Sequence, residues 1–244
     1  MTIDGKDARD LKRKERMFLE SKKAKSRMPQ LGEAVFCIAY LVFDFVAAIV
    51  FFAGAHGNQA VFLFGVLTLI LGGGDAFHLV PRIAKAFRGE SRHIEWWSGL
   101  GLMISSITMT AFYVLLFHIW RVIFPDVSYP RILSLLIWGS AMLRILLCLS
   151  PQNNWFRAEG SREWGIYRNI PFAVTGICLV VLFLLSGNTG GYGLWQMSIA
   201  IVISFACYFP VVLLSKKKPM VGMLMIPKTI AYIWMISMGF RLLG

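Results

Sequence analysis

Three ionisable side chains lie within an apolar stretch of the sequence, at residues 71–82. Asp75, His78 and Arg82 follow one another at spacings of three and four positions, so a helix would place them on one face about two turns long. An aspartate and a histidine can exchange a proton near neutral pH, and an arginine binds anions. Because charges inside an apolar segment are costly, this face is predicted to bind a ligand or to carry out acid–base chemistry.

Two further cations, Arg144 and Lys228, lie deep in later apolar runs. A charge at mid-depth in a bilayer is costly unless it is paired or hydrated. We therefore interpret Arg144, Lys228 and Asp75 as site residues rather than as ion pairs that only fix helix packing. For Arg82 and Arg168, near the ends of their runs, the alternative is that each side chain extends to the membrane interface.

The composition places the chain in a membrane. Of its 244 residues 57% are hydrophobic and only 16% are charged, and the mean hydropathy is +0.64, which leaves too few polar side chains to cover a soluble globule. The net charge is +12, and ten lysines and arginines precede the first apolar run. This concentrated charge favours contact with anionic lipid head groups over nucleic acid.

Seven apolar runs follow a basic segment at residues 1–28 and make up a membrane domain at residues 29–244. Each run approaches the roughly 20 residues that cross a bilayer as a helix. The predicted fold is an all-α bundle of seven transmembrane helices. The runs lie at residues 31–54, 59–80, 96–118, 131–150, 166–186, 194–214 and 220–242.

The connections between the runs alternate in charge. Residues 56–58 and 187–192 carry no lysine or arginine, and residues 119–130 carry only Arg121. At or beside the other three connections lie Arg82, Lys85, Arg88 and Arg92, then Arg157, Arg162 and Arg168, and then Lys216, Lys217 and Lys218. By the positive-inside rule the N-terminus is predicted to be cytoplasmic and the C-terminus outside. No cleavable signal peptide is visible, so we expect a multi-pass protein of a bacterial-type inner membrane.

This orientation gathers ionisable residues from five of the seven runs in the cytoplasmic half. Lys228 would lie about 12 Å into the seventh run at 1.5 Å per residue. Glu33 opens the first run and Asp44 lies deeper in it. Five prolines at similar depth could break helices around a water-filled cavity. The predicted cavity is lined by Asp75, His78, Arg82, Arg144, Asn153, Arg168, Lys228 and Tyr232.

The function expected first is binding or transport of an anionic small molecule or lipid head group in this cytoplasm-facing cavity. Cations outnumber anions at that depth, so Arg144 and Lys228 are predicted to hold the anion, while Asp75 and His78 carry a proton. Three runs, one linking run and three more would also permit two parallel repeats, an arrangement known among transporters. Membrane lipids are the other expected partners.

The second alternative is an intramembrane lipid hydrolase. Seven helices, a cytoplasmic N-terminus and the Asp75/His78 pair near the inner leaflet are similar to the ceramidase-like and adiponectin-receptor-like zinc hydrolases. That resemblance implies a set of three histidines with serine and aspartate, but only His78 of the four histidines lies near Asp75. No metal site is predicted, and an enzyme here would use the Asp/His pair without a closed zinc site.

The third alternative is a photoreceptor. A lysine in the seventh helix, as in the segment Lys228-Thr-Ile-Ala-Tyr-Ile-Trp234, resembles the Schiff-base lysine of retinal proteins. The third run has no carboxylate to act as counter-ion, so Asp75 of the second run would have to replace it. Retinal is therefore the lowest-ranked of the possible cofactors, and the sequence identifies none.

Cysteines and hydroxyl residues are interpreted as packing residues. Ser105, Ser106 and Thr110 lie in the third run, where small hydroxyl residues most often join helices. We therefore assign no nucleophile among them. The four cysteines lie in apolar runs without CxxC spacing and are typical of small buried side chains: Cys37, Cys148, Cys178 and Cys207.

Overall fold

The computed structural model describes residues 31–88, 92–156, 160–215 and 218–243. The predicted basic segment at residues 1–28 lies outside these ranges. Within them the chain forms seven helices that are long and apolar enough to cross a membrane, as predicted. They are Leu31–Gly54, α2 (Gln59–Arg88), α3 (Arg92–Ile123), α4 (Arg131–Leu149), α5 (Arg162–Ser186), α6 (Gln196–Leu214) and Met220–Leu242, whose central part is α7 (Met225–Gly239).

The seventh run has the predicted bounds, whereas α2 and α3 extend beyond the predicted ones. The helix α2 continues through Pro81 to Arg88, eight residues beyond the expected end at residue 80. Proline removes one backbone donor, but a helix buried against neighbours can continue past it. The seventh run begins and ends with 3-10 turns, Pro219–Leu224 and Phe240–Leu242, so its α-helical part is short.

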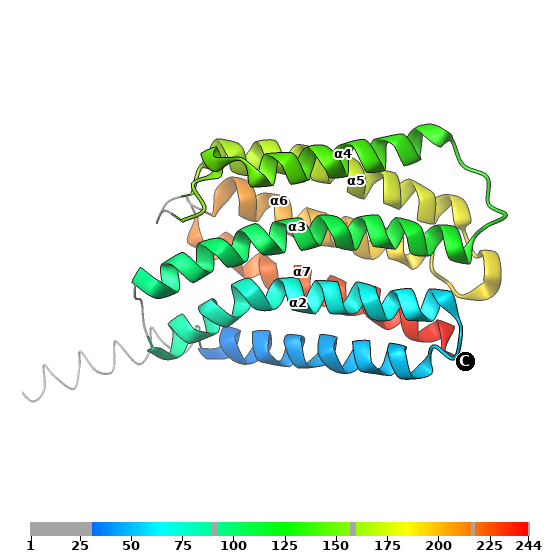
Figure 1. Ribbon diagram of the computed structural model, residues 1–244, viewed down its shortest axis with the longest axis horizontal. Helices are drawn as coiled ribbons and strands as arrows, with labels where there is room; N and C mark the ends of the chain where they lie inside the picture. The colour runs from blue at the N-terminus through cyan, green and yellow to red at the C-terminus, as the bar shows by residue number, and fades with distance from the viewer. Residues whose placement is uncertain (1–30, 89–91, 157–159, 216–217, 244) are drawn as a thin grey trace, which may run out of the picture.

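The helices run antiparallel to one another along the long axis of the molecule (Figure 1). The helices α2, α3, α5, α6 and α7 each contact the next, and α7 returns to α2, while α4 packs outside against α3 and α5. We call the end of the bundle where α2 ends and α5 begins the basic end. The connections that precede α2, α4 and α6 lie at the opposite end (Figure 1).

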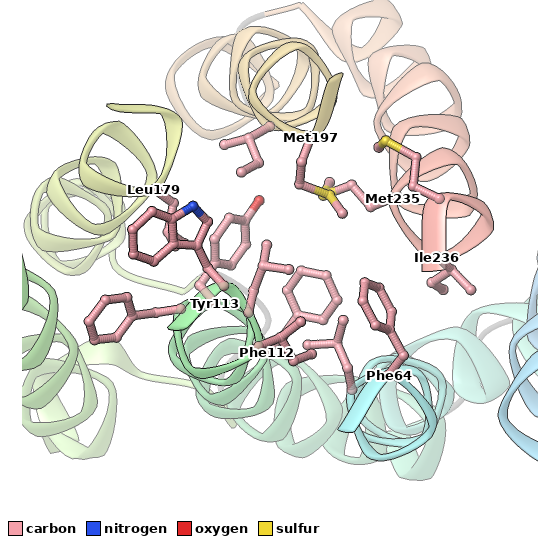
Figure 2. Packing of buried hydrophobic residues seen from close by; sticks show 14 of the residues in the cluster. Phe64, Phe112, Tyr113, Leu179, Met197, Met235 and Ile236 are labelled. Carbon is pink, nitrogen blue, oxygen red and sulfur yellow. The ribbon is translucent and has the colours of Figure 1, made fainter. Parts of the chain in front are cut away.

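The core fills the half of the bundle toward the opposite end. Large apolar side chains from all five helices of the ring meet there, and Figure 2 shows them pointing into the space that the helices enclose. Aromatic rings meet edge to face, with 5.0 Å between the centroids of Tyr113 and Phe172. The labelled residues of this core are Phe64, Phe112, Tyr113, Leu179, Met197, Met235 and Ile236.

The outer surface of the bundle is also apolar. Ile49, Leu135 and Ile177 are among many large aliphatic side chains that are exposed on different helices. Water would disfavour an apolar surface of this extent, whereas lipid chains would not. Apolar side chains therefore both fill the core and cover the outside of the bundle.

Glycines let α2 and α3 approach closely. A Cβ atom added at Gly101 would lie 2.7 Å from the Cα atom of His78 and would also clash with the backbone of Phe77. One at Gly74 would lie 2.6 Å from the Cβ atom of Thr108. The contact at Gly101 is with backbone atoms, which cannot turn away, so this pair of helices is fixed by a small residue at the point of closest approach.

We expect Gly101→Ala to lower the free energy of unfolding by about 1–3 kcal/mol, because the added methyl group would force the two helices apart. Thermal unfolding of the purified protein in detergent, followed by tryptophan fluorescence, measures this change. Gly139→Ala on α4 is the matched control, since nothing lies within 4 Å of a Cβ atom there. Equal unfolding temperatures for the two variants would contradict the close approach.

Candidate functional site

Arg144 of α4 is enclosed by protein. Only 2% of Arg144 is exposed, and its Cζ atom lies 3.2 Å from the ring centroid of Phe172 on α5. Within the described ranges its Nε and Nη1 atoms make no hydrogen bond, and it forms no salt bridge with a carboxylate. A guanidinium has five N–H donors and keeps its charge, so enclosed donors without acceptors are costly.

Lys228 lies in the first turn of α7 and is buried against two tyrosines. Its Nζ atom is 4.8 Å from the ring centroid of Tyr232 and 5.0 Å from that of Tyr208. These distances allow cation–π attraction to both rings. The same two tyrosines are among the strongest electrostatic neighbours of Arg144, so the two cations share their surroundings.

Arg168 completes what we call the cation cluster: Arg144, Arg168 and Lys228. Its guanidinium stacks on Trp155, with 4.1 Å from Cζ to the ring centroid. Its Nη1 atom donates a hydrogen bond of 2.7 Å to Oδ1 of Asn153. Arg144 and Arg168 are close enough to interact electrostatically, so like charges have been brought together on α4 and α5.

Asn153 has a structural role that its residue type did not indicate. Its Nδ2 atom donates to the carbonyl oxygens of Leu147 at 2.6 Å and Ser150 at 2.9 Å, while its Oδ1 accepts from Arg168. These bonds add to the backbone hydrogen bonds that the same two carbonyl oxygens accept at the C-terminal end of α4. Asn153, predicted as a ligand-binding residue, therefore positions Arg168 and ends α4.

A second group, the acid cluster, surrounds Asp75 of α2. Tyr40 of the first helix donates to its Oδ2 and Ser105 of α3 donates to its Oδ1, both at 2.9 Å. His78 lies one turn along α2, with 3.7 Å between its Nδ1 and the Oδ1 of Asp75. Asp44, entirely buried on the first helix, is near enough to interact electrostatically with Asp75.

The two clusters meet at Lys228. Asp75 is one of its electrostatic neighbours, and the lysine in turn acts on His78. Arg144 and Asp75, which the sequence predicted around a single cavity, belong to different clusters with Lys228 between them. Tyr232, also predicted, contacts the cation cluster through Lys228.

Arg82 lies apart from both clusters. Its Nη2 atom pairs with Oε1 of Glu33 at the basic end, and the arginine side chain is half exposed. The helical spacing correctly placed Arg82 on the face of Asp75, but the first helix supplies a nearer anion. The structure therefore gives Arg82 a surface ion pair rather than a place beside Asp75.

Sequence reasoning missed the roles of Tyr40 and Ser105. The prediction that Ser105 is a packing residue was incomplete, since it hydrogen-bonds a buried carboxylate. Its neighbour Ser106 donates to the carbonyl oxygen of Leu102 in its own helix and fits the packing interpretation. No local pattern separates the two serines, because the close approach of α3 to α2 decides which of them faces Asp75.

The histidines do not gather. His56 lies in the connection before α2, His118 is exposed near the end of α3, and His93 stacks on Trp97 with 6.1 Å between ring centroids. In the ranges that the structure describes, no group of three or more His, Cys, Asp or Glu residues is placed to hold a metal ion. This arrangement differs from the ligand set of the zinc hydrolases.

Comparison of the chain with protein-family models, with curated proteins and with solved structures finds no match. The function must therefore be argued from the two clusters themselves.

We expect Asn153→Ala to lower the free energy of unfolding by about 1–3 kcal/mol, because it removes the side-chain hydrogen bonds to the end of α4 and takes the acceptor from one arginine donor. Thermal unfolding in detergent measures the loss. Asn188→Ala is the control, since this exposed asparagine makes no side-chain hydrogen bond among the described residues. If both variants unfold with the wild type, Asn153 does not support α4 in the way its bonds indicate.

Proposed function

We propose that this chain is a multi-pass membrane protein that binds or transports an anionic small molecule or lipid head group at its cation cluster. Seven long apolar helices and an apolar outer surface support membrane insertion. Arg162 and Lys218 are among the basic residues at the basic end. By the positive-inside rule this end faces the cytoplasm, so the cluster lies in the half of the bundle toward the inner leaflet of a bacterial-type membrane.

The enclosed guanidinium of Arg144 is the observation that carries the proposal. Its Nε and Nη1 donors have no acceptor among the described residues, and another arginine, Arg168, acts on it electrostatically. A phosphate, sulfate or carboxylate group would accept these donors in charge-assisted hydrogen bonds. The same anion would offset the repulsion between the like charges on α4 and α5.

The surroundings suit a ligand that enters and leaves. The 3-10 turn Pro219–Leu224 precedes the helical turn that carries Lys228. In the neighbouring helix α6, Pro210 lies inside the helix. Irregular backbone at membrane depth is typical of transporter sites, where half-helix N-termini point at anionic groups. Lys228, in the first turn of α7, is therefore well placed to meet an anion.

Sulfate and phosphatidylglycerol test the two sources of such an anion. Binding is measured as the rise in unfolding temperature of the detergent-purified protein on titration, with zwitterionic phosphatidylcholine as the neutral comparison. Stabilisation by sulfate identifies a small-anion site, and stabilisation by phosphatidylglycerol alone identifies a lipid head-group site. Phosphatidylcholine should have no effect in either case.

We expect Arg144→Leu and Lys228→Met each to weaken this binding at least tenfold, because removal of one partner from a buried charged hydrogen bond typically costs about 2–5 kcal/mol. Without anion, Arg144→Leu should unfold no earlier than the wild type, since an apolar residue replaces an unpaired buried charge. Arg121→Leu is the matched control: it removes an exposed arginine near the opposite end. Unaltered binding in both cluster variants would remove the proposal.

Lipid hydrolysis is the second candidate function. It is favoured by one observation, the meeting of Ser105, Asp75 and His78 at the acid cluster. Here Asp75 would act as a general base on the serine hydroxyl or on water, with His78 beside it.

We expect His78→Ala to abolish any turnover of a fluorogenic long-chain amide or ester if this candidate holds. Hydrolysis by the purified wild type is the reference, and His118→Ala at an exposed position is the control. Turnover that survives His78→Ala would exclude the Asp/His mechanism and leave anion binding as the function.

A further inference from the structure

Asp44 is the most completely enclosed carboxylate of the described chain. It is 0% exposed, and neither of its side-chain oxygens has a hydrogen-bond partner in the part of the chain that the structure describes. The first helix packs tightly on α2 at this level, since a Cβ atom at Gly72 would lie 2.7 Å from the Cβ atom of Asp44. An ionised carboxylate is very costly in such surroundings, whereas a protonated one is tolerated.

Among the described residues, the neighbours of Asp44 supply no compensating cation. Its neighbours are Tyr40 on the same helix and Asp75 on α2. Tyr40 already donates its hydroxyl hydrogen to Asp75. Asp75, in contrast, accepts hydrogen bonds from Tyr40 and Ser105 and interacts electrostatically with Lys228 of α7. When two carboxylates share one enclosure, they do not both ionise, and the less supported one keeps a proton.

A cavity lies at the basic end, on the same pair of helices as these two residues. It has a volume of about 260 Å³ and is lined by Glu33, Arg82 and Cys37, among others, between the first helix and α2. Cys37 lies one helical turn before Tyr40 and is an electrostatic neighbour of Asp75. His78, beside Asp75, keeps a partly exposed side chain. The basic end of this helix pair therefore has open space one helical turn from Tyr40.

We propose that Asp44 and Asp75 form a proton-binding pair, in which Asp44 holds a proton while Asp75 is ionised, and that an anion arriving at Lys228 draws a second proton onto Asp75. The first half of this statement stands on the acid cluster alone, and the second rests on the proposed function. The step balances in charge: the anion takes the ammonium group away from Asp75, and one proton from solution adds to a carboxylate oxygen of Asp75.

A proton fits the pair better than a metal cation does. The ammonium group of Lys228 faces Asp75 and repels a second positive charge. The hydroxyl hydrogens of Tyr40 and Ser105 point at Asp75, so their orientation suits an anionic oxygen rather than a metal ion beside it. Proton uptake together with an anion would also reduce the net charge that enters the membrane.

Infrared spectroscopy tests the pair directly, in the full chain purified in detergent at neutral pH. We expect the carbonyl absorption of a buried protonated carboxylic acid, shifted in D₂O and abolished in Asp44→Asn. Asp126→Asn, the same change in an exposed connection, should leave the band intact. A wild type without this band, or an Asp44→Asn variant that keeps it, would overturn the proton pair.

The coupling is tested by titrating sulfate or phosphatidylglycerol, whose charges do not change over the range, at several pH values. We expect wild-type affinity to rise as the pH falls, by up to about tenfold per pH unit for one coupled proton, and Asp75→Asn to make binding independent of pH. Wild-type affinity that does not change with pH would overturn the coupling. Absence of binding by either probe at every pH would count against the anion site itself, while the infrared band still decides the proton pair.

Discussion

Two buried cations and one partly buried cation lie against aromatic rings rather than carboxylates, and the rest of the site depends on these contacts. Arg144 lies on Phe172, Arg168 on Trp155, and Lys228 beside two tyrosines. A ring face attracts a cation but accepts few of its hydrogen bonds. The positive charge is thus held in place by packing while several donors stay available, as a binding site for a charged acceptor requires.

The bundle supports this arrangement by separating its two halves. The half toward the opposite end is filled with aromatic and aliphatic side chains, whereas the buried charges lie toward the basic end. Because α4 packs outside α3 and α5, it can bring Arg144 against Phe172 without entering the core. The Asn153 side chain then ends α4 and holds Arg168 beside it.

The seven helices follow from hydropathy alone, because each run is long enough and apolar enough to be identified without its neighbours. Helix ends were less predictable, since packing carries α2 past Pro81. The cost of burying a charge correctly singled out Arg144, Lys228 and Asp75 as buried residues. Their partners could not be predicted, because the meeting of Ser105 with Asp75 depends on how closely α3 approaches α2.

The sequence analysis predicted that all the site residues line one cavity. In the structure they form two clusters, the cation cluster and the acid cluster, and Lys228 interacts with both. Spacing along a helix says which residues share a face, but it does not say which neighbouring helix that face meets. Asn153 and Arg82 illustrate the difference, since their types suit a ligand while their contacts are with Arg168 and Glu33.

The packed core toward the opposite end bears on whether ions can pass along the inside of the bundle. Phe64, Phe112 and Trp120 are fully buried there. If the protein transports an anion as proposed, this apolar layer would block its passage until the side chains repack. The flexible thioethers of Met197 and Met235 are the parts of the layer that can repack at the least cost.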